Sequence, residues 1–280
     1  MTNNSILITG TSTGIGKACA LLLAQKGFNV FACVRKETDG EALIKEATGR
    51  LTPIYLDVSE SEAIKKAVKT VSKATGGELF GLVNNAGICL ATPVELTPID
   101  ELRQSLEVNI IGAIAMTKAF LPLLKKGKGR IVNMGSVFGL CSIPCRGSYA
   151  ASKSAMEAFT DCMRLEFKPY GITVSIIEPG GIQTEIWRKD DEQRDKIYSD
   201  CDPGTYKLYK PLIASVNRRI HSTPFLPAEA VAKKVSHIFR SKKPKARYIV
   251  GMDTRIMHFV ERFPTVIRDI IIRNVFCPKY

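Results

Sequence analysis

The N-terminal part of the chain contains a short apolar segment, a glycine-rich turn and a helical pattern in direct succession. Residues 5–9 predict a buried strand, and residues 17–26 have the alanine and leucine content of a helix that stops at Gly27. Helix N-termini present free N–H groups and a positive dipole end to phosphates, and glycines let a pyrophosphate approach the backbone. The residues of this predicted phosphate turn are Gly10, Thr11, Ser12, Thr13, Gly14, Ile15 and Gly16.

A glycine triplet alone also fits an ordinary turn, and its GxxxGxG spacing differs from the GxGxxG of two-domain dehydrogenases. Its position between an apolar strand and a helix favours a dinucleotide. Further strands are expected at residues 29–33, 52–56, 79–83 and 173–178, each ending in polar or glycine residues. Strands alternate with helical patterns without a linker rich in Pro, Gly or Ser. The sequence therefore predicts one α/β domain over residues 1–280, a Rossmann fold with a doubly wound parallel sheet and helices on both faces.

Tyr149 and Lys153 lie four residues apart, so a helix would place both on one face, and Ser136 lies thirteen residues upstream. A neighbouring ammonium favours the phenolate and lowers the pKa of a tyrosine toward working pH, where acid/base catalysis is effective. Such a pair also arises by chance as a solvated contact. Its significance depends on the accompanying motifs.

Those motifs follow one order along the chain: the glycine turn, Asn84-Asn85-Ala86-Gly87, Asn109, Ser136, Tyr149, Lys153 and Pro179-Gly180. In this order the chain resembles the short-chain dehydrogenase/reductase family over about residues 5–185 and near residue 250. The resemblance implies that Tyr149 is the acid/base, that Ser136 positions the substrate oxygen, and that Lys153 lowers the pKa of Tyr149 and holds the nicotinamide ribose. Asn109, inside an apolar helix expected at about 99–121, would hold a water of a proton relay; its alternative role is to cap or fill a kink.

The same resemblance assigns the remaining cofactor contacts. Besides the glycine turn, Tyr149 and Lys153, they are Asp57, Val58, Asn85, Ala86, Gly87, Pro179, Gly180, Ile182 and Thr184. After the second strand, where an acidic residue would accept the ribose of NAD, the chain has Val34 and then Arg35. Arg35 can pair with a 2′-phosphate, which favours NADP(H), with NAD(H) as the alternative. Many NADP-linked relatives also have a basic residue at the position of Thr13, and Arg35 also fits a solvated charge.

Residues 185–226 mix aromatic and aliphatic residues with charges, and we expect a lid over an apolar substrate. A helix pair packed on the core has a similar composition. The chain most resembles the hydroxysteroid and retinol dehydrogenase branch, which implies exchange between a lipophilic secondary alcohol and a ketone. The alternatives are a broad carbonyl reductase, a 3-oxoacyl reductase of lipid metabolism, and a non-catalytic NADP(H) sensor. The complete set of Ser136, Tyr149 and Lys153 argues against the sensor.

Cysteine usage and charge limit which binding partners and which cellular compartment we expect for this protein. The eight cysteines form no CxxC pair or zinc-ligand spacing, which predicts buried free thiols, no metal site and a cytoplasmic protein. We expect no signal peptide at the N-terminus, and no apolar run approaches the roughly eighteen residues of a membrane span. Of the net charge of +13, most lies in residues 203–280, with sixteen Lys and Arg against four acidic residues. No motif for nucleic acid accompanies this charge.

The C-terminal extension, residues 252–280, contains an amphipathic pattern from Arg255 to Phe276 that Pro264 divides into two short helices. Its apolar stripe fits a face packed on the domain or on a second subunit. It also fits a helix pair at an anionic membrane surface, with arginines on the headgroups. The resemblance implies a homodimer or homotetramer paired through the helices that contain Asn109 and Tyr149.

Overall fold

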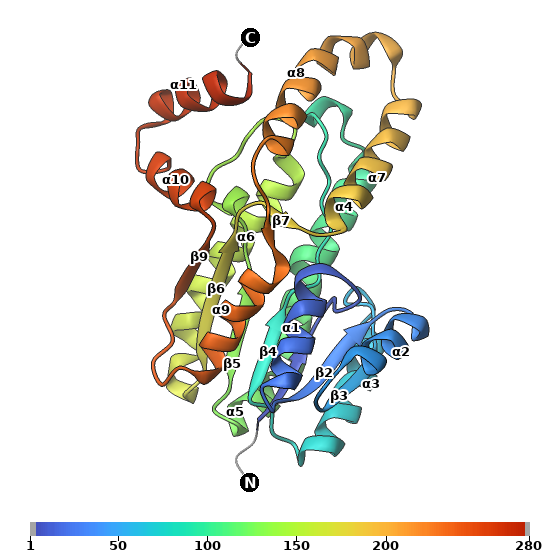
Figure 1. Ribbon diagram of the computed structural model, residues 1–280, viewed down its shortest axis with the longest axis vertical. Coiled ribbons are helices and arrows are strands. Elements are labelled where there is room, and N and C mark those ends of the chain that lie inside the picture. Colours follow the sequence, from blue (N-terminus) through green and yellow to red (C-terminus); the bar gives the residue numbers. More distant parts are fainter. Residues whose placement is uncertain (1–3, 278–280) are drawn as a thin grey trace.

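The computed structural model describes residues 4–277, and a seven-stranded parallel sheet forms its centre (Figure 1). The strand order is β3-β2-β1-β4-β5-β6-β9. All of these strands are parallel, and the topological switch point, where successive strands begin to add on the other side of β1, lies between β1 and β4. The strands are β1 (Ser5–Ile8), β2 (Asn29–Val34), β3 (Leu51–Tyr55), β4 (Gly81–Asn84), β5 (Arg130–Met134), β6 (Thr173–Pro179) and β9 (Arg247–Val250). Pro53 is accommodated because β3 is an edge strand. The predicted doubly wound α/β fold is confirmed, with strand ends shifted by one or two residues.

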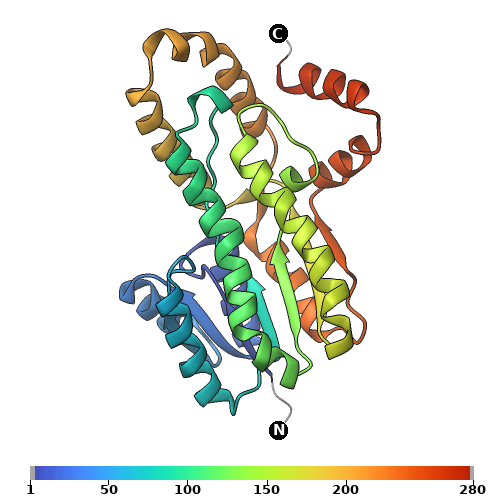
Figure 2. The ribbon, with the colours of Figure 1, turned by 180° about the vertical axis from the view of Figure 1, so that it is seen from behind.

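Helices cover both faces of the sheet because its strands are apolar on both sides (Figures 1 and 2). On one face α1 packs beside α9, and Ala20, Leu23 and Val235 are buried there. On the other face α3 and α5 lie side by side, and Phe120 of α5 and Leu82 of β4 are buried there. The helices of this part are α1 (Gly14–Gln25), α2 (Glu37–Glu46), α3 (Ser61–Thr75), α4 (Ile99–Leu106), α5 (Ala113–Lys126), α6 (Gly147–Glu166) and α9 (Ala228–Arg240), with short turns η1 (Val94–Leu96), η3 (Val137–Gly139) and η4 (Lys168–Tyr170).

The helix expected at about 99–121 is longer and is not regular throughout. A π-helical turn, η2 (Glu107–Gly112), separates α4 from α5, so the single regular helix of the prediction is corrected. The whole stretch Ile99–Lys126 is long and apolar enough to span a membrane by length and composition, contrary to the expectation from sequence. Met116, Phe120 and Leu124 are fully buried against the sheet, so its apolar face belongs to the domain core.

A second group of helices lies beyond the carboxyl ends of the strands, at the top of Figure 1. The expected lid consists of α7 (Ile186–Asp200) and α8 (Pro203–His221). Its two ends meet where β7 (Ile182–Gln183) pairs with β8 (Leu226–Pro227). The C-terminal extension forms α10 (Met252–Val260) and α11 (Thr265–Phe276), divided at Pro264 as predicted, with residues 278–280 outside the described residues.

Candidate active site

A cavity of about 820 Å³ opens between the carboxyl ends of the strands and the lid helices. It brings together residues that lie far apart in the sequence, from Gly10 through Ser136, Tyr149 and Lys153 to Thr184. All of the predicted site residues line it except two. Thr11 and Asn109 are buried and are not among its lining residues.

The glycine turn at one end of the cavity has the geometry of a phosphate cradle. Gly10 and Gly14 have positive φ angles of 67° and 56°, which favour glycine. A Cβ at Gly16 would lie 2.1 Å from the carbonyl oxygen of Gly10 and 2.4 Å from Asn85 Nδ2. The side chain of Thr13 does not cap α1, so the first N–H groups of this helix remain available to an anion.

Two side chains that connect β1 to β4 hold this turn in place. Thr9 Oγ1 accepts hydrogen bonds from the backbone N–H groups of Asn85 (2.9 Å) and Ala86 (3.0 Å). Asn85 Nδ2 donates to the carbonyl oxygens of Thr9 and Gly10, at 2.9 and 3.0 Å. Thr11 Oγ1 donates to Cys33 O at 2.9 Å and joins the turn to β2. Thr9 was not among the predicted residues, because its partners lie more than seventy positions away.

Arg35 and Asp57 line the cavity together, just after β2 and β3. Arg35 Nη1 lies 3.6 Å from Asp57 Oδ2, and its side chain is 71% exposed. Burial alone would raise the pKa of Asp57, but hydrogen bonds from Ser59 and the charge of Arg35 hold it below the usual value. An exposed pair at this distance contributes little to stability, so the guanidinium can turn to an incoming phosphate.

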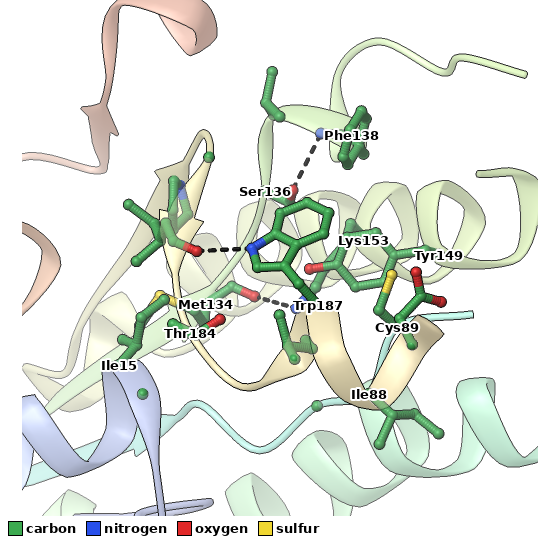
Figure 3. A pocket seen from close by; sticks show the side chains of 18 of the residues that line it. Ile15, Ile88, Cys89, Met134, Ser136, Phe138, Tyr149, Lys153, Thr184 and Trp187 are labelled. Atoms are coloured by element: carbon green, nitrogen blue, oxygen red, sulfur yellow. Dashed lines mark hydrogen bonds between the residues drawn. The ribbon is translucent and has the colours of Figure 1, made fainter. Parts of the chain in front are cut away.

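Ser136, Tyr149 and Lys153 converge in the middle of the cavity (Figure 3). Ser136 lies two residues after β5 and caps the short turn η3, where its Oγ accepts the N–H of Phe138 at 3.2 Å. Tyr149 lies in the first turn of α6, with its ring edge-on to Phe138 at 6.2 Å. Lys153 Nζ lies 5.5 Å from the centre of the Tyr149 ring and donates to Met134 O at 2.8 Å. One helix and one strand end thus place a hydroxyl, a phenol and an ammonium around the same space.

Burial determines the acidity of this group. It raises the pKa of Tyr149, and the hydrogen bond to Ser136 opposes the shift without reversing it. The expected lowering by Lys153 is therefore not seen in this arrangement, in which the ammonium bonds to a backbone carbonyl. Burial also lowers the pKa of Lys153 to about 8, against the opposing charge of Glu157 one helical turn away. Tyr149 accordingly holds its proton across the neutral range.

Asn109 occupies the π-helical turn η2, which packs against α6. Its Oδ1 accepts the N–H of Ile88 at 2.8 Å, and its Nδ2 donates to Ile88 O at 2.9 Å and to Ser152 Oγ at 3.0 Å. Ser152 Oγ in turn donates to Tyr149 O at 2.8 Å. These bonds join the wall at Ile88 to the first turn of α6. Asn109 does not cap a helix end, because α4, η2 and α5 continue through it, and its position in the irregular turn agrees with the alternative of filling a kink.

The loop after β6 is fastened to the C-terminal extension. Gly180 N–H donates to Val250 O at 2.9 Å, and Gly181 N–H donates to Asp253 Oδ2 at 2.7 Å. A Cβ at Gly180 would lie 2.1 Å from the Asp253 carboxylate, so this contact requires glycine. Asp253, which sequence reasoning missed, thus positions the segment that contains Pro179, Ile182 and Thr184.

The outer half of the cavity is apolar. Trp187 stacks on Phe225 with ring centres 5.0 Å apart, and its Nε1 donates to Ile182 O at 2.8 Å, which closes the base of the lid (Figure 3). Further apolar lining comes from the lid helices (Ile186 and Ile220), from the C-terminal extension (Met252, Ile256, Met257, Val275 and Phe276), and from η3 and the loop after it (Phe138 and Ile143). The sequence had indicated the apolar lid, but Phe138, Ile143 and the lining role of α10 and α11 were not predicted.

A buried ionic cluster joins the lid to the catalytic helix. Asp190 of α7 contacts Arg146, just before α6, at 2.9 Å and Arg194 at 3.4 Å. Arg146 and Asp190 are almost fully buried, and Arg146 Nη1 also lies 3.9 Å from Cys89 Sγ. Charges removed from water need such partners. No local signal in the sequence could have paired Arg146 with Asp190, because forty-four positions separate them.

This arrangement can hold a dinucleotide at the glycine turn and an apolar molecule beneath the lid. Between them lie a protonated phenol and a serine hydroxyl, which suit proton donation to a carbonyl oxygen. Among residues 4–277 no group of three or more His, Cys, Asp or Glu side chains is placed to hold a metal ion.

Comparisons with known proteins relate this chain to oxidoreductases. Residues 4–195 match the family model described as short chain dehydrogenase. An NADPH-dependent 3-dehydrocapnine reductase of Ornithobacterium rhinotracheale is 37% identical over 88% of this chain and 87% of its own length. Mouse mitochondrial D-beta-hydroxybutyrate dehydrogenase is 42% identical over 79% and 75%. Mouse retinol dehydrogenase 7 is 32% identical over 94% and 86%.

Proposed function

Because the chain belongs to the short-chain dehydrogenase family, whose members are oxidoreductases that act on CH–OH groups, we propose that it reduces a lipophilic ketone to a secondary alcohol with NADPH. The single observation that carries this proposal is the convergence of Ser136, Tyr149 and Lys153 between the glycine turn and the apolar half of one cavity. The chain would also catalyse the reverse oxidation, since catalysis does not change an equilibrium.

The residues of the chain fit a dinucleotide. A Cβ at Gly16 would collide with Gly10 O, so the turn keeps its tight shape only with glycine there, and the N-terminus of α1 begins at this turn, where its free N–H groups suit a pyrophosphate. The glycine turn would hold the phosphates, Asn85 to Gly87 and Pro179 to Thr184 would flank the nicotinamide half, and Lys153 would hold its ribose. When bound, this cofactor supplies the hydride.

The remaining chemistry is carried out by protein side chains. Ser136 Oγ and the Tyr149 hydroxyl would hydrogen-bond the ketone oxygen and orient its carbon toward the cofactor side of the cavity. Tyr149 would then give its proton to the oxygen as negative charge develops there. The raised pKa of Tyr149 keeps the proton on the phenol until the ketone oxygen takes it, and the Lys153 ammonium would stabilise the phenolate that remains. Asn109 would fix the position of the first turn of α6 through its hydrogen bond to Ser152. It would also hold a water molecule in the path by which Lys153 and Tyr149 regain a proton.

Preference for NADP(H) would depend on Arg35. Val34 stands where an NAD-binding protein has a carboxylate that accepts hydrogen bonds from the ribose hydroxyls. Arg35→Ala should raise the KM for NADPH by roughly tenfold or more, the effect of one charge-assisted hydrogen bond, and leave the KM for NADH nearly unchanged. Steady-state kinetics with both cofactors tests this. Lys36→Ala, which removes the neighbouring exposed charge, is the matched control. Equal losses in both variants, or equal use of both cofactors by the native protein, would disprove a specific role for Arg35.

The apolar half of the cavity supports a lipophilic substrate. NADPH oxidation measured with steroid ketones, retinal, acetoacetyl thioesters and small quinones separates the candidates. Reduction of steroids or retinal alone supports the proposal, broad activity indicates a carbonyl reductase, and selective use of the thioester indicates a 3-oxoacyl reductase. NADPH binding without turnover on any of them would indicate a sensor.

We propose a homodimer or homotetramer as the assembly. Ile111 of η2 and Phe159 and Leu165 of α6 are exposed large apolar residues on the helices that the family resemblance assigns to pairing. Light scattering should therefore give at least twice the monomer mass, and Phe159→Glu combined with Leu165→Glu should shift it to the monomer. A native monomer would refute this assembly.

We also propose that the C-terminal extension contacts a membrane surface. Its apolar stripe does not mainly pack on the domain, because Ile256, Phe259, Ile267 and Ile270 are between 42% and 61% exposed. Only Val260 of α10 and Phe276 of α11 are buried apolar residues of these helices. Such a face suits the boundary between headgroups and acyl chains, where a lipophilic ketone dissolves.

A further inference from the structure

A basic groove on the outer side of the sheet takes no part in the proposed reaction. It is an open cavity of about 690 Å³ between α9, the edge strand β9 and α10. Tyr248, Ile249 and Phe259 form its apolar lining. Its other lining residues are all basic, and they are Lys234, His237, Lys245, Arg247, Arg255, His258 and Arg262.

Two of these residues are paired with carboxylates inside the protein. Arg247 lies 2.8 Å from Glu157 and contacts the fully buried Glu178, and His258 Nε2 lies 2.6 Å from the other oxygen of Glu178. These bonds fix the floor of the groove.

Four other cations of the groove lack such partners. Lys234, Lys245, Arg255 and Arg262 form no ion pair with a carboxylate of residues 4–277. They come from α9, the segment before β9, α10 and the turn after α10, so several parts of the chain bring like charges to one concave surface. Like charges repel, and a bound anion would relieve this repulsion.

We infer that the groove binds the phosphate group of an anionic phospholipid, an inference that rests on the proposed membrane contact and assigns its headgroup site. Charge complementarity supplies the first argument. The second is continuity with the apolar face: Phe259 lines the groove and is 61% exposed, and Ile256 lies beside it on α10 at 54%. A phosphate in the groove would leave its acyl chains next to these side chains.

A second copy of this chain is a poor occupant. A symmetric dimer through this face would place the same cations opposite each other, which is unfavourable without a counter-charge. An acidic carrier protein would satisfy the cations but would leave the exposed residues of α11, Val266, Ile267 and Ile270, without a partner.

The groove and the active site share α10. Met252, Ile256 and Met257 line the catalytic cavity, whereas Arg255, His258 and Arg262 line the groove. A lipid held in the groove would therefore place the apolar mouth of the cavity at the bilayer, from which the substrate could enter without crossing water.

Cosedimentation of the full-length protein with phosphatidylcholine vesicles, with and without phosphatidylglycerol, tests the inference. Arg255→Ala combined with Arg262→Ala should weaken binding to the anionic vesicles by tenfold or more. Each cation near an anionic surface contributes on the order of a factor of five to the affinity, and two are removed. The matched control, Lys65→Ala combined with Arg103→Ala, removes two exposed charges elsewhere and should have little effect. Phe259→Ser combined with Ile267→Ser should weaken binding through the apolar face.

Three results would overturn the groove as a headgroup site. The first is equal loss in the Arg255/Arg262 and control variants, and the second is loss only in the Phe259/Ile267 variant, which leaves the membrane contact standing without this site. The third is a native protein that binds neither kind of vesicle. In that case, binding of an acidic acyl carrier protein that depends on Arg255 and Arg262 would identify the carrier as the occupant instead. Ketone reduction without vesicles, measured on the same variants, should stay near native, so failure of the proposed oxidoreductase activity is detected separately.

Discussion

Tyr149→Phe is expected to lower the turnover of ketone reduction by at least about a hundredfold, the usual contribution of a general acid. The substitution keeps the ring, and with it the edge contact to Phe138, but removes the proton that the ketone oxygen would receive. NADPH affinity should remain nearly native, because Lys153 and the glycine turn are unchanged. Steady-state kinetics measure the turnover, and a titration of NADPH binding measures the affinity for the cofactor.

Tyr170→Phe is the matched control, since it removes a phenol hydroxyl from an exposed residue of η4 on the surface. It should leave turnover within the error of the native enzyme. Near-native turnover of a folded Tyr149→Phe variant would refute the assignment of Tyr149 as the proton donor.

Lys153→Met should reduce both turnover and NADPH affinity, because Lys153 has two proposed partners, the phenolate and the ribose. The pH profile gives a further readout. Burial lowers the pKa of Lys153 to about 8, so its charge is present below that pH and is lost as the pH rises through it. Values of kcat/KM for reduction should therefore fall above about pH 8 in the native enzyme.

In Lys153→Met this fall should be absent, because no group titrates at that position and only a low, flat rate remains. A thermal melt monitors folding, since the side chain is buried. Native cofactor affinity in the variant, or an unchanged fall of kcat/KM above pH 8, would contradict the role assigned to Lys153.

Short-range rules were sufficient to predict the fold, and the predicted catalytic and cofactor residues came from the order of the motifs and the family resemblance. A strand, a glycine turn and a helix adjacent in sequence favour a turn that can hold phosphates, and the positive φ angles of Gly10 and Gly14 agree with glycine at those positions. Tyr149 and Lys153 share a helix face because four residues complete about one turn. The division of the C-terminal extension at Pro264 also follows from local chemistry, since proline cannot donate the helical hydrogen bond.

Only the tertiary structure decided features that depend on desolvation and on distant partners. The pKa of Tyr149 moves upward, not downward, because burial outweighs a nearby charge whose orientation the sequence does not contain. The bond from Gly181 to Asp253 spans seventy-two positions, and no periodic pattern relates the two residues. The exposure of Ile256 and Phe259 likewise depends on which surface α10 leaves uncovered, so an amphipathic pattern alone could not distinguish a packed face from a free one. The sequence by itself thus determined the local geometry of the catalytic helix and the glycine turn, whereas the folded chain determined their electrostatic environment and the surfaces around them, because burial is a property of the whole packed structure.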